Sequence, residues 1–244
     1  MESSPQHRFA TTQWSLVLEA GRRTNPDADA ALETLCGVYW FPLYAFARRR
    51  GYSPDDAADV TQEFFSRLIE KSFLETADPE HGRFRTFLLT IFQRFLAKEY
   101  DRSQAAKRGG GQIRLSINFD DGEMRYAGGL TDEQTPERIF ERQWAFTVLQ
   151  RVVGLLRVEY QTRDKAELFE QCRSFLVGSQ SSGGYTQVAQ TLKMTEGALR
   201  VAVHRLRERY RELLRHEIAE TIAGDASIDD ELNYLRQAIR GENG

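Results

Sequence analysis

Apolar residues recur every three or four positions along most of the chain, and the strict alternation of a half-buried strand is nearly absent. This pattern and the turn signals between its segments predict helices over about 11–23, 28–50, 55–71 and 84–102, a long helix that opens at Pro136, and further helices over 165–176 and 186–222. Pro42 interrupts the second of these segments, so we expect a kink there or a break into two helices. The sequence therefore predicts an all-α protein.

The segment 106–135 differs in composition from both of its neighbours. It begins near a run of three glycines, has no sustained period, and leads into a stretch, 120–137, with six acids and one arginine. Such a segment is typical of an interdomain linker. We therefore expect two small helical domains joined by a flexible linker and followed by an acidic amphipathic tail, with boundaries at 1–105, 106–135, 136–223 and 224–244. The tail is expected to cap the second domain as a helix, although it could instead mask a basic helix or bind a regulator.

The stretch 185–215 has the spacing of a helix-turn-helix. Thr186 is expected to cap a short first helix and Thr195 to cap the second, with a tight turn between them. Ala189 supplies the small side chain that a close crossing of two helices needs. The outward face of the second helix is basic, with Arg200, His204, Arg205, Arg207, Arg209 and Arg211. This face suits DNA, with early residues at base edges and later arginines at phosphates. The alternative is an arginine-rich, solvated face on an ordinary helical hairpin.

The segment 84–96 places aromatic and aliphatic residues on one helical face, which we expect to be core, Phe87 and Phe92 included. The opposite side is basic at four-residue steps and continues into the linker, with Arg94, Lys98, Arg102, Lys107 and Arg108. Cations beside aromatic rings suit single-stranded or melted DNA, where bases stack on rings and cations follow phosphates.

The helix before this segment carries charge of the opposite sign. Asp59, Gln62, Glu63 and Ser66 fall on one face of 55–71. Such a stripe could dock on a basic partner, and it is equally typical of a solvated helix face.

Together these segments resemble a known family. DDAADVTQEFFSRL, GRFRTFLLTIFQRFL and, after a linker, YTQVAQTLKMTEGALRVAVHRLR occur in the order and spacing of an extracytoplasmic-function sigma factor of bacterial RNA polymerase. The resemblance covers roughly 35–214, and the stretches TPERIFERQW and GALRVAVHRLRERYRELL are similar to a subgroup of planctomycete-like bacteria. It implies a protein that binds core RNA polymerase and directs promoter recognition, promoter melting and transcription initiation.

The resemblance also implies roles for individual residues. The residues that it implies for binding to core polymerase are Asp56, Asp59, Gln62 and Glu63. Those implied at the melted minus-ten element are Arg94, Lys98, Arg102, Lys107 and Arg108. Those implied in the major groove of the minus-thirty-five element are Arg200, Val201, His204 and Arg205, with Arg207 and Arg209 beside them on the same helix.

Three positions depart from the usual pattern of this family. Ala58 stands in place of an acid in the core-binding motif, Arg94 in place of a smaller polar residue, and Lys193 in place of the glycine of the turn. Thr61 lies in the weakened acidic motif, where a Ser/Thr kinase activates some relatives, and a phosphate there would restore about 1.5–2 negative charges. An anti-sigma factor is the other regulator that the resemblance suggests.

Composition excludes several other functions. The four histidines (7, 81, 204 and 216) have no metal-ligand or nucleophile-partner spacing, and no glycine-rich phosphate loop follows a strand. We therefore expect no enzyme, no catalytic residue, no cofactor and no metal. There is no run of eighteen apolar residues, no secretory pattern, and two cysteines in all, so we expect a cytoplasmic protein without membrane insertion.

The net charge of −3 appears to argue against a nucleic-acid partner, but it is a sum over segregated segments. The segment 83–108 has seven basic residues and two acids, 185–216 has seven and three, and 120–137 offsets them with its six acids. Whole-chain charge therefore excludes only a uniformly basic DNA-binding protein. The alternative function is a stand-alone helix-turn-helix regulator that acts without core polymerase.

Overall fold

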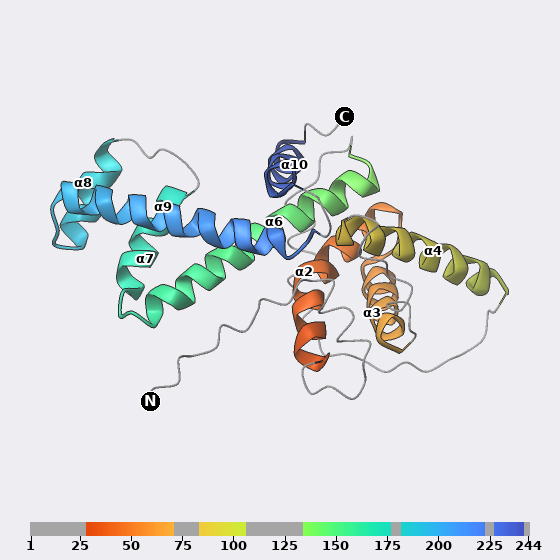
Figure 1. The fold of residues 1–244 in the computed structure, drawn as a ribbon. Helices are drawn as coiled ribbons and strands as arrows, with labels where there is room; N and C mark the ends of the chain where they lie inside the picture. Colours follow the sequence, from red (N-terminus) through yellow and green to blue (C-terminus); the bar gives the residue numbers. More distant parts are fainter. Residues whose placement is uncertain (1–27, 71–82, 106–133, 177–181, 223–226, 242–244) are drawn as a thin grey trace, which may run out of the picture. The chain divides into compact units, whose positions relative to one another are not determined.

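The computed structural model describes residues 28–70, 83–105, 134–176, 182–222 and 227–241, and all regular secondary structure within these ranges is helical (Figure 1). The elements are α2 (Ala28–Arg49), α3 (Pro54–Glu70), α4 (Phe84–Ala105), α6 (Pro136–Gln161), α7 (Ala166–Cys172), the 3₁₀ turn η3 (Arg173–Leu176), α8 (Ser182–Thr191), α9 (Glu196–Ala219) and α10 (Ile228–Arg240). The all-α prediction is confirmed for this part of the chain. The helix predicted over 11–23 and nearly all of the predicted linker lie outside the described residues.

Several helix starts follow the capping residues seen in the sequence. Ser53, just before Pro54, accepts a hydrogen bond at its Oγ from the Asp56 amide at 3.1 Å. Thr135, just before Pro136, accepts one at its Oγ1 from the Arg138 amide at 3.3 Å. In both places a proline occupies the first helical position, where its missing N–H costs nothing.

Of the kink or break expected at Pro42, the break is wrong, because α2 runs through this residue as one helix. All residues from 38 to 47 are buried, so the segment on each side of Pro42 packs into the core. A helix that is apolar all round is stabilised by burial rather than by one amphipathic face. That burial offsets the hydrogen bond that Pro42 cannot donate.

The chain forms two compact units, which divide it differently from the predicted domains. Unit 1 comprises 1–147 and 218–244, and unit 2 comprises 148–217, so the division falls inside α6 rather than in the segment 106–135. The first half of α6 belongs to unit 1 because Trp144, fully buried, packs under the Arg85 guanidinium at 4.6 Å. Helix α10 also belongs to unit 1, where it contacts α4 through Glu231 and the first half of α6 through Tyr234.

The centre of unit 1 is a set of aromatic rings from α2, α3 and α4. The Phe92 ring centroid lies 4.9 Å from that of Phe64 and 6.0 Å from that of Phe46, both edge-on. Phe92 is fully buried, which confirms its place in the core, whereas Phe87 is only half-buried. This core positions the outer faces of α3 and α4.

Helix α10 is joined to unit 1 by a buried ion cluster. The Glu231 carboxylate is 1% exposed and forms ion pairs with Arg83, at 2.7 Å, and with Arg85, which is 3% exposed. The Tyr234 ring lies against the same two guanidinium groups, at 5.1 Å and 4.3 Å. Burial and a hydrogen bond to Glu141 of α6 raise the pKa of Tyr234 to about 12. Residues from the C-terminal part of the chain thus complete the packing around the start of α4.

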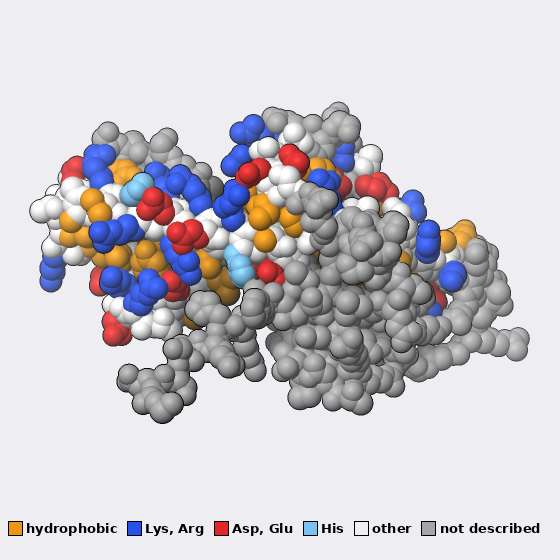
Figure 2. Space-filling model, in the orientation of Figure 1, with side chains coloured by type: hydrophobic (Ala, Val, Ile, Leu, Met, Phe, Trp, Pro, Cys, Tyr) orange, Lys and Arg blue, Asp and Glu red, His pale blue; other side chains and the backbone are white. Residues whose placement is uncertain are grey.

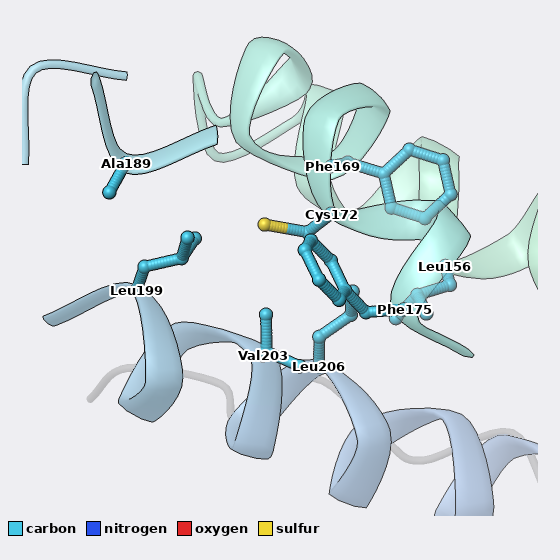
Figure 3. Close-up of a cluster of buried hydrophobic side chains, with 8 residues drawn as sticks. All are labelled: Leu156, Phe169, Cys172, Phe175, Ala189, Leu199, Val203 and Leu206. Carbon is cyan, nitrogen blue, oxygen red and sulfur yellow. The ribbon is translucent and has the colours of Figure 1, made fainter. Parts of the chain in front are cut away.

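Unit 2 is built around a second apolar cluster, drawn in Figure 3. It brings together α6, α7, η3, α8 and α9 through Leu156, Phe169, Cys172, Phe175, Ala189, Leu199, Val203 and Leu206. Ala189 is 3% exposed and lies in this cluster with Leu199, as expected for a position where α8 and α9 meet. Thr195 caps α9 by accepting from the Ala198 amide at 3.2 Å, whereas α8 begins at Ser182, so the prediction of Thr186 as its cap is wrong.

Lys193, in the turn between α8 and α9, adopts a left-handed conformation with φ of 51°. A side chain in this region clashes with its own backbone, and glycine avoids that cost. Lys193→Gly should therefore raise the free energy of unfolding of unit 2 by about 0.5–1 kcal/mol. This net value already subtracts the stability that is lost because glycine has more conformational freedom in the unfolded chain. Urea denaturation would measure this, with Lys193→Ala as the matched control because it removes the charge and keeps the strained Cβ. Equal stabilities for the glycine and alanine variants would contradict the prediction.

Candidate functional site

The outer face of α3 presents acidic side chains. Asp56 and Asp59 are exposed, and Glu63 is half-buried one turn further along. Asp56 accepts a hydrogen bond from Ser53 Oγ at 2.7 Å, and Glu63 accepts one from Arg67 at 2.7 Å. Three of the four residues that the resemblance assigns to polymerase binding therefore share one accessible face.

The fourth, Gln62, is 6% exposed, and its neighbour Thr61 is fully buried. Both lie on the side of α3 that packs inward with Ala58 and Phe65, since the buried arc of this helix is wider than its apolar residues indicate. Gln62 is thus not part of the accessible acidic face. A kinase cannot reach the Thr61 hydroxyl while α3 is packed, which weighs against phosphorylation of the folded domain.

A groove of about 670 Å³ lies between α3, α4 and the turn after α2. Its lining residues are Arg50, Gly51, Tyr52, Asp56, Asp59, Val60, Glu63, Phe95, Glu99 and Tyr100. Four of these are acids and three are aromatic, and Arg67 links the two walls by pairing with Glu63 and Glu99, each at 2.7 Å. The groove suits a partner segment with basic side chains and some apolar surface.

Sequence reasoning did not find the α4 wall of this groove. Tyr100 is 61% exposed, which is unusual for so large a ring, and Glu99 faces α3 through Arg67. The signal was present as an acid and an aromatic residue next to each other after the core stripe of 84–96, but the basic residues around them masked it.

The basic residues of α4 occupy another part of its surface. Arg94 and Lys98 are both exposed and one turn apart. Arg102 lies within α4, but its side chain is outside the described residues, as are Lys107 and Arg108. Helix α4 thus carries one wall of the groove, formed by Phe95, Glu99 and Tyr100, and exposed cations on another part of its surface.

The outer face of α9 carries four of the six residues predicted to bind DNA there. Arg200, Val201, His204 and Arg205 are exposed, and 50% of Val201 is accessible. Arg200 pairs with Glu196 at 3.6 Å, and His204 Nε2 lies 3.2 Å from Glu208. Figure 2 shows acidic side chains interspersed among the Lys and Arg of this part of the molecule. The face is therefore less basic than its arginines alone indicate.

The other two residues, Arg207 and Arg209, hold unit 2 together. Arg207 donates two hydrogen bonds to the Phe175 carbonyl, from Nε at 3.0 Å and Nη2 at 2.8 Å. Arg209 pairs with Glu159 of α6 at 2.9 Å and with Glu212 at 2.8 Å. Both guanidinium groups are thus engaged within the unit, which the outward-face prediction did not anticipate.

The acidic groove and the exposed cations of α4 both lie within one segment that matches a known family. Residues 42–105 match the Sigma-70 region 2 family. No curated protein and no solved structure gives a significant match to the chain. Sigma-70 region 2 is the part of a sigma factor that binds core RNA polymerase and recognises and melts promoter DNA. This part of the chain is thus a sigma-70 region 2 domain.

The region 2 domain belongs to a family without enzymatic activity, in agreement with the expectation that the chain is not an enzyme. Within the described ranges, no group of three His, Cys, Asp or Glu side chains could hold a metal ion. The helices in the same ranges are too short or too polar to cross a membrane. The matched segment does not supply all of its own packing. Trp144 and Glu231, which lie outside the match, cover Arg85 at the start of α4.

Proposed function

We propose that the chain is an alternative sigma factor of the extracytoplasmic-function type, from a planctomycete-like subgroup, and that it acts in the cytoplasm. The observation that carries the proposal is the region 2 match over a segment with an acidic groove and exposed cations on the same pair of helices. Core polymerase and promoter DNA, duplex and melted, are its partners. It needs no cofactor.

In this proposal the acidic groove binds core polymerase. Asp56, Asp59 and Glu63 supply the negative charge, and Tyr52 and Tyr100 supply apolar contact area at its rim. Gln62 does not contact the partner directly in this proposal, because it is buried, and its role is to support the acidic face from within the helix packing. Ala58 is buried as well, at 8% exposure, so an acid at this position would not have faced the partner without repacking α3.

The exposed Arg94 and Lys98 of α4 hold the minus-ten element, together with three cations that follow them in the sequence. Arg94 lies near the base that leaves the stack, and Lys98, Arg102, Lys107 and Arg108 follow the phosphates. Unstacking a base costs a few kcal/mol, so a site that traps it couples recognition to strand opening.

The α8–α9 pair acts as the helix-turn-helix that binds the minus-thirty-five element. Arg200, Val201, His204 and Arg205 enter the major groove, and their exposure on one face of α9 supports this role. Arg207 and Arg209 support the fold of the pair, given their bonds to Phe175 and Glu159. An anti-sigma factor that covers the acidic groove is the regulator best suited to this arrangement, since Thr61 is buried.

Asp59→Lys should weaken binding to core polymerase by about tenfold or more, because a cation in the groove repels a basic partner. A tenfold change corresponds to about 1.4 kcal/mol of binding free energy, which the loss of one favourable charge contact and the gain of a repulsive one can supply. Affinity would be measured by titrating labelled full-length protein with purified core enzyme. Glu167→Lys is the matched control, because it makes the same charge change at an exposed position on α7. Equal losses for the two variants would indicate a general charge effect and contradict a docking role for the groove.

The stand-alone regulator remains the alternative function, and the partner requirement separates the two. A sigma factor should footprint promoter DNA only together with core polymerase, whereas a dimeric regulator should protect a palindrome alone. A pull-down with core polymerase, combined with footprints with and without it, distinguishes them. Protection of a palindrome in the absence of core polymerase would overturn the proposal.

A further inference from the structure

Three side chains from η3, α8 and α9 lie together at the beginning of α9. Phe175 is fully buried, and the Tyr185 ring lies on it with centroids 4.4 Å apart. The Arg200 guanidinium lies over the Tyr185 ring, with Cζ 4.8 Å from its centroid. The arginine thus lies on the Tyr185 ring, which is itself in contact with the buried Phe175 ring.

The same guanidinium is also held from the side. Arg200 Nη2 lies 3.6 Å from Glu196 Oε2, and the other Glu196 oxygen accepts a hydrogen bond from Thr186 Oγ1 at 2.5 Å. Thr186 and Tyr185 are neighbours in α8, whereas Glu196 and Arg200 occupy the first turns of α9. Two adjacent residues of one helix therefore fix an acid and an arginine of the other.

This arrangement constrains a side chain that is otherwise flexible. A guanidinium that lies over a ring keeps N–H donors at its edge, and 58% of the Arg200 side chain is exposed, with Nη2 on the side of Glu196. Two parallel donors at that edge match the O6 and N7 acceptors of guanine in the major groove. A reader that is already held in place loses less conformational entropy when it binds.

We infer that Tyr185 and Glu196 are positioning residues that hold Arg200 with its donor edge outward to read a guanine of the promoter duplex, an inference that rests on the proposed DNA-binding role of the α8–α9 pair. Tyr185 provides the platform for the guanidinium. Glu196 sets its rotation and, as an acid close to the DNA, opposes binding of this face to phosphates of unrelated sequence. Neither residue belongs to the basic set from which the DNA-binding face was predicted.

The test uses the full-length protein bound to core polymerase and a random duplex library, from which the preferred base pairs are selected. Arg200→Ala should lower the preference at one or two adjacent base pairs by about 5- to 150-fold. Tyr185→Leu, which keeps apolar bulk against Phe175, should lower the preference by a smaller factor at the same base pairs. Tyr185→Phe, which keeps the ring, should retain the wild-type preference. Glu196→Gln should raise affinity for unrelated duplex while lowering the same preference.

A double-mutant cycle separates positioning from general stability. Because Tyr185 acts through Arg200, Tyr185→Leu should add nothing to Arg200→Ala, whereas its effect should add to that of Arg211→Ala, an exposed arginine later on α9. If Arg200→Ala relaxes the preference but Tyr185→Leu leaves it unchanged, or if the two effects add, the inference is overturned and the proposed function stands.

If Arg200→Ala and His204→Ala both leave every base preference unchanged, the DNA-binding role of α9 itself fails. Should Tyr185→Leu unfold unit 2, Arg200→Lys takes its place: it keeps the charge and loses the planar edge, so an unchanged guanine preference overturns the inference.

Discussion

Glu231→Gln is expected to destabilise unit 1 by about 3–5 kcal/mol, the cost of leaving a buried ion without its partner. Arg85 is 3% exposed and contacts Glu231, which is itself 1% exposed, so neither charge can turn to water. Arg83 is 37% exposed and can reach solvent when the carboxylate is removed. The uncompensated charge in the variant is therefore that of Arg85.

The loss should spread beyond the single contact because the cluster joins three helices. Arg85 of α4 lies 4.6 Å from the Trp144 ring of α6 and 4.3 Å from the Tyr234 ring of α10. Once Glu231 no longer holds Arg83 and Arg85, α10 should detach first. The start of α4 would then be exposed to solvent.

Hydrogen exchange followed by mass spectrometry would locate this loss, and urea denaturation of the full-length chain would measure its size. Asp230→Asn is the matched control, since it removes an exposed carboxylate from the same helix. Replacing both partners with apolar residues, Arg85→Met with Glu231→Leu, should recover most of the stability, because such swaps of buried pairs are often neutral. A cost below about 1 kcal/mol for Glu231→Gln, as for a surface pair, would contradict the buried cluster.

Capping residues and helical periodicity were sufficient to predict most helix starts, because both act within a single turn of the chain. Ser53, Thr135 and Thr195 each accept from the amide three residues later, as their sequence context indicates. Pro42 shows the limit of local rules: its effect depends on whether the helix on either side is buried, and α2 is buried throughout 38–47.

Contacts between distant segments decided which polar residues are accessible, and no local pattern encodes them. Arg207 and Arg205 look alike in the sequence, yet Arg207 bonds to the Phe175 carbonyl at the end of η3, whose position depends on how η3 packs on α9. Glu231 was predicted only as part of an acidic tail, since nothing near it indicates Arg85 as its partner. The region 2 segment was evident from its own residues, whereas the elements that complete unit 1 come from elsewhere in the chain.

The aromatic stripe of α4 gives the second large effect, and it separates a core role from a DNA-binding role. Phe92→Ala should lower the free energy of unfolding of unit 1 by about 3–5 kcal/mol, because the ring is fully buried between Phe46 and Phe64 and its removal leaves a cavity. Phe87→Ala should cost only about 1 kcal/mol, because this ring is half-buried. Urea denaturation of the two variants would measure the difference.

Promoter opening then distinguishes stacking on bases from packing in the core. At a temperature where Phe87→Ala is fully folded, the holoenzyme should open a promoter as well as the wild type does, as judged by permanganate reactivity of unpaired thymines. Arg94→Ala, an exposed change on the same helix, should leave stability unchanged and reduce opening, because it removes a cation from the melted strand. A folded Phe87→Ala variant that fails to open the promoter would instead place this ring against an unstacked base. In that case the aromatic residues of α4 would have two roles, with Phe92 in the core and Phe87 at the DNA.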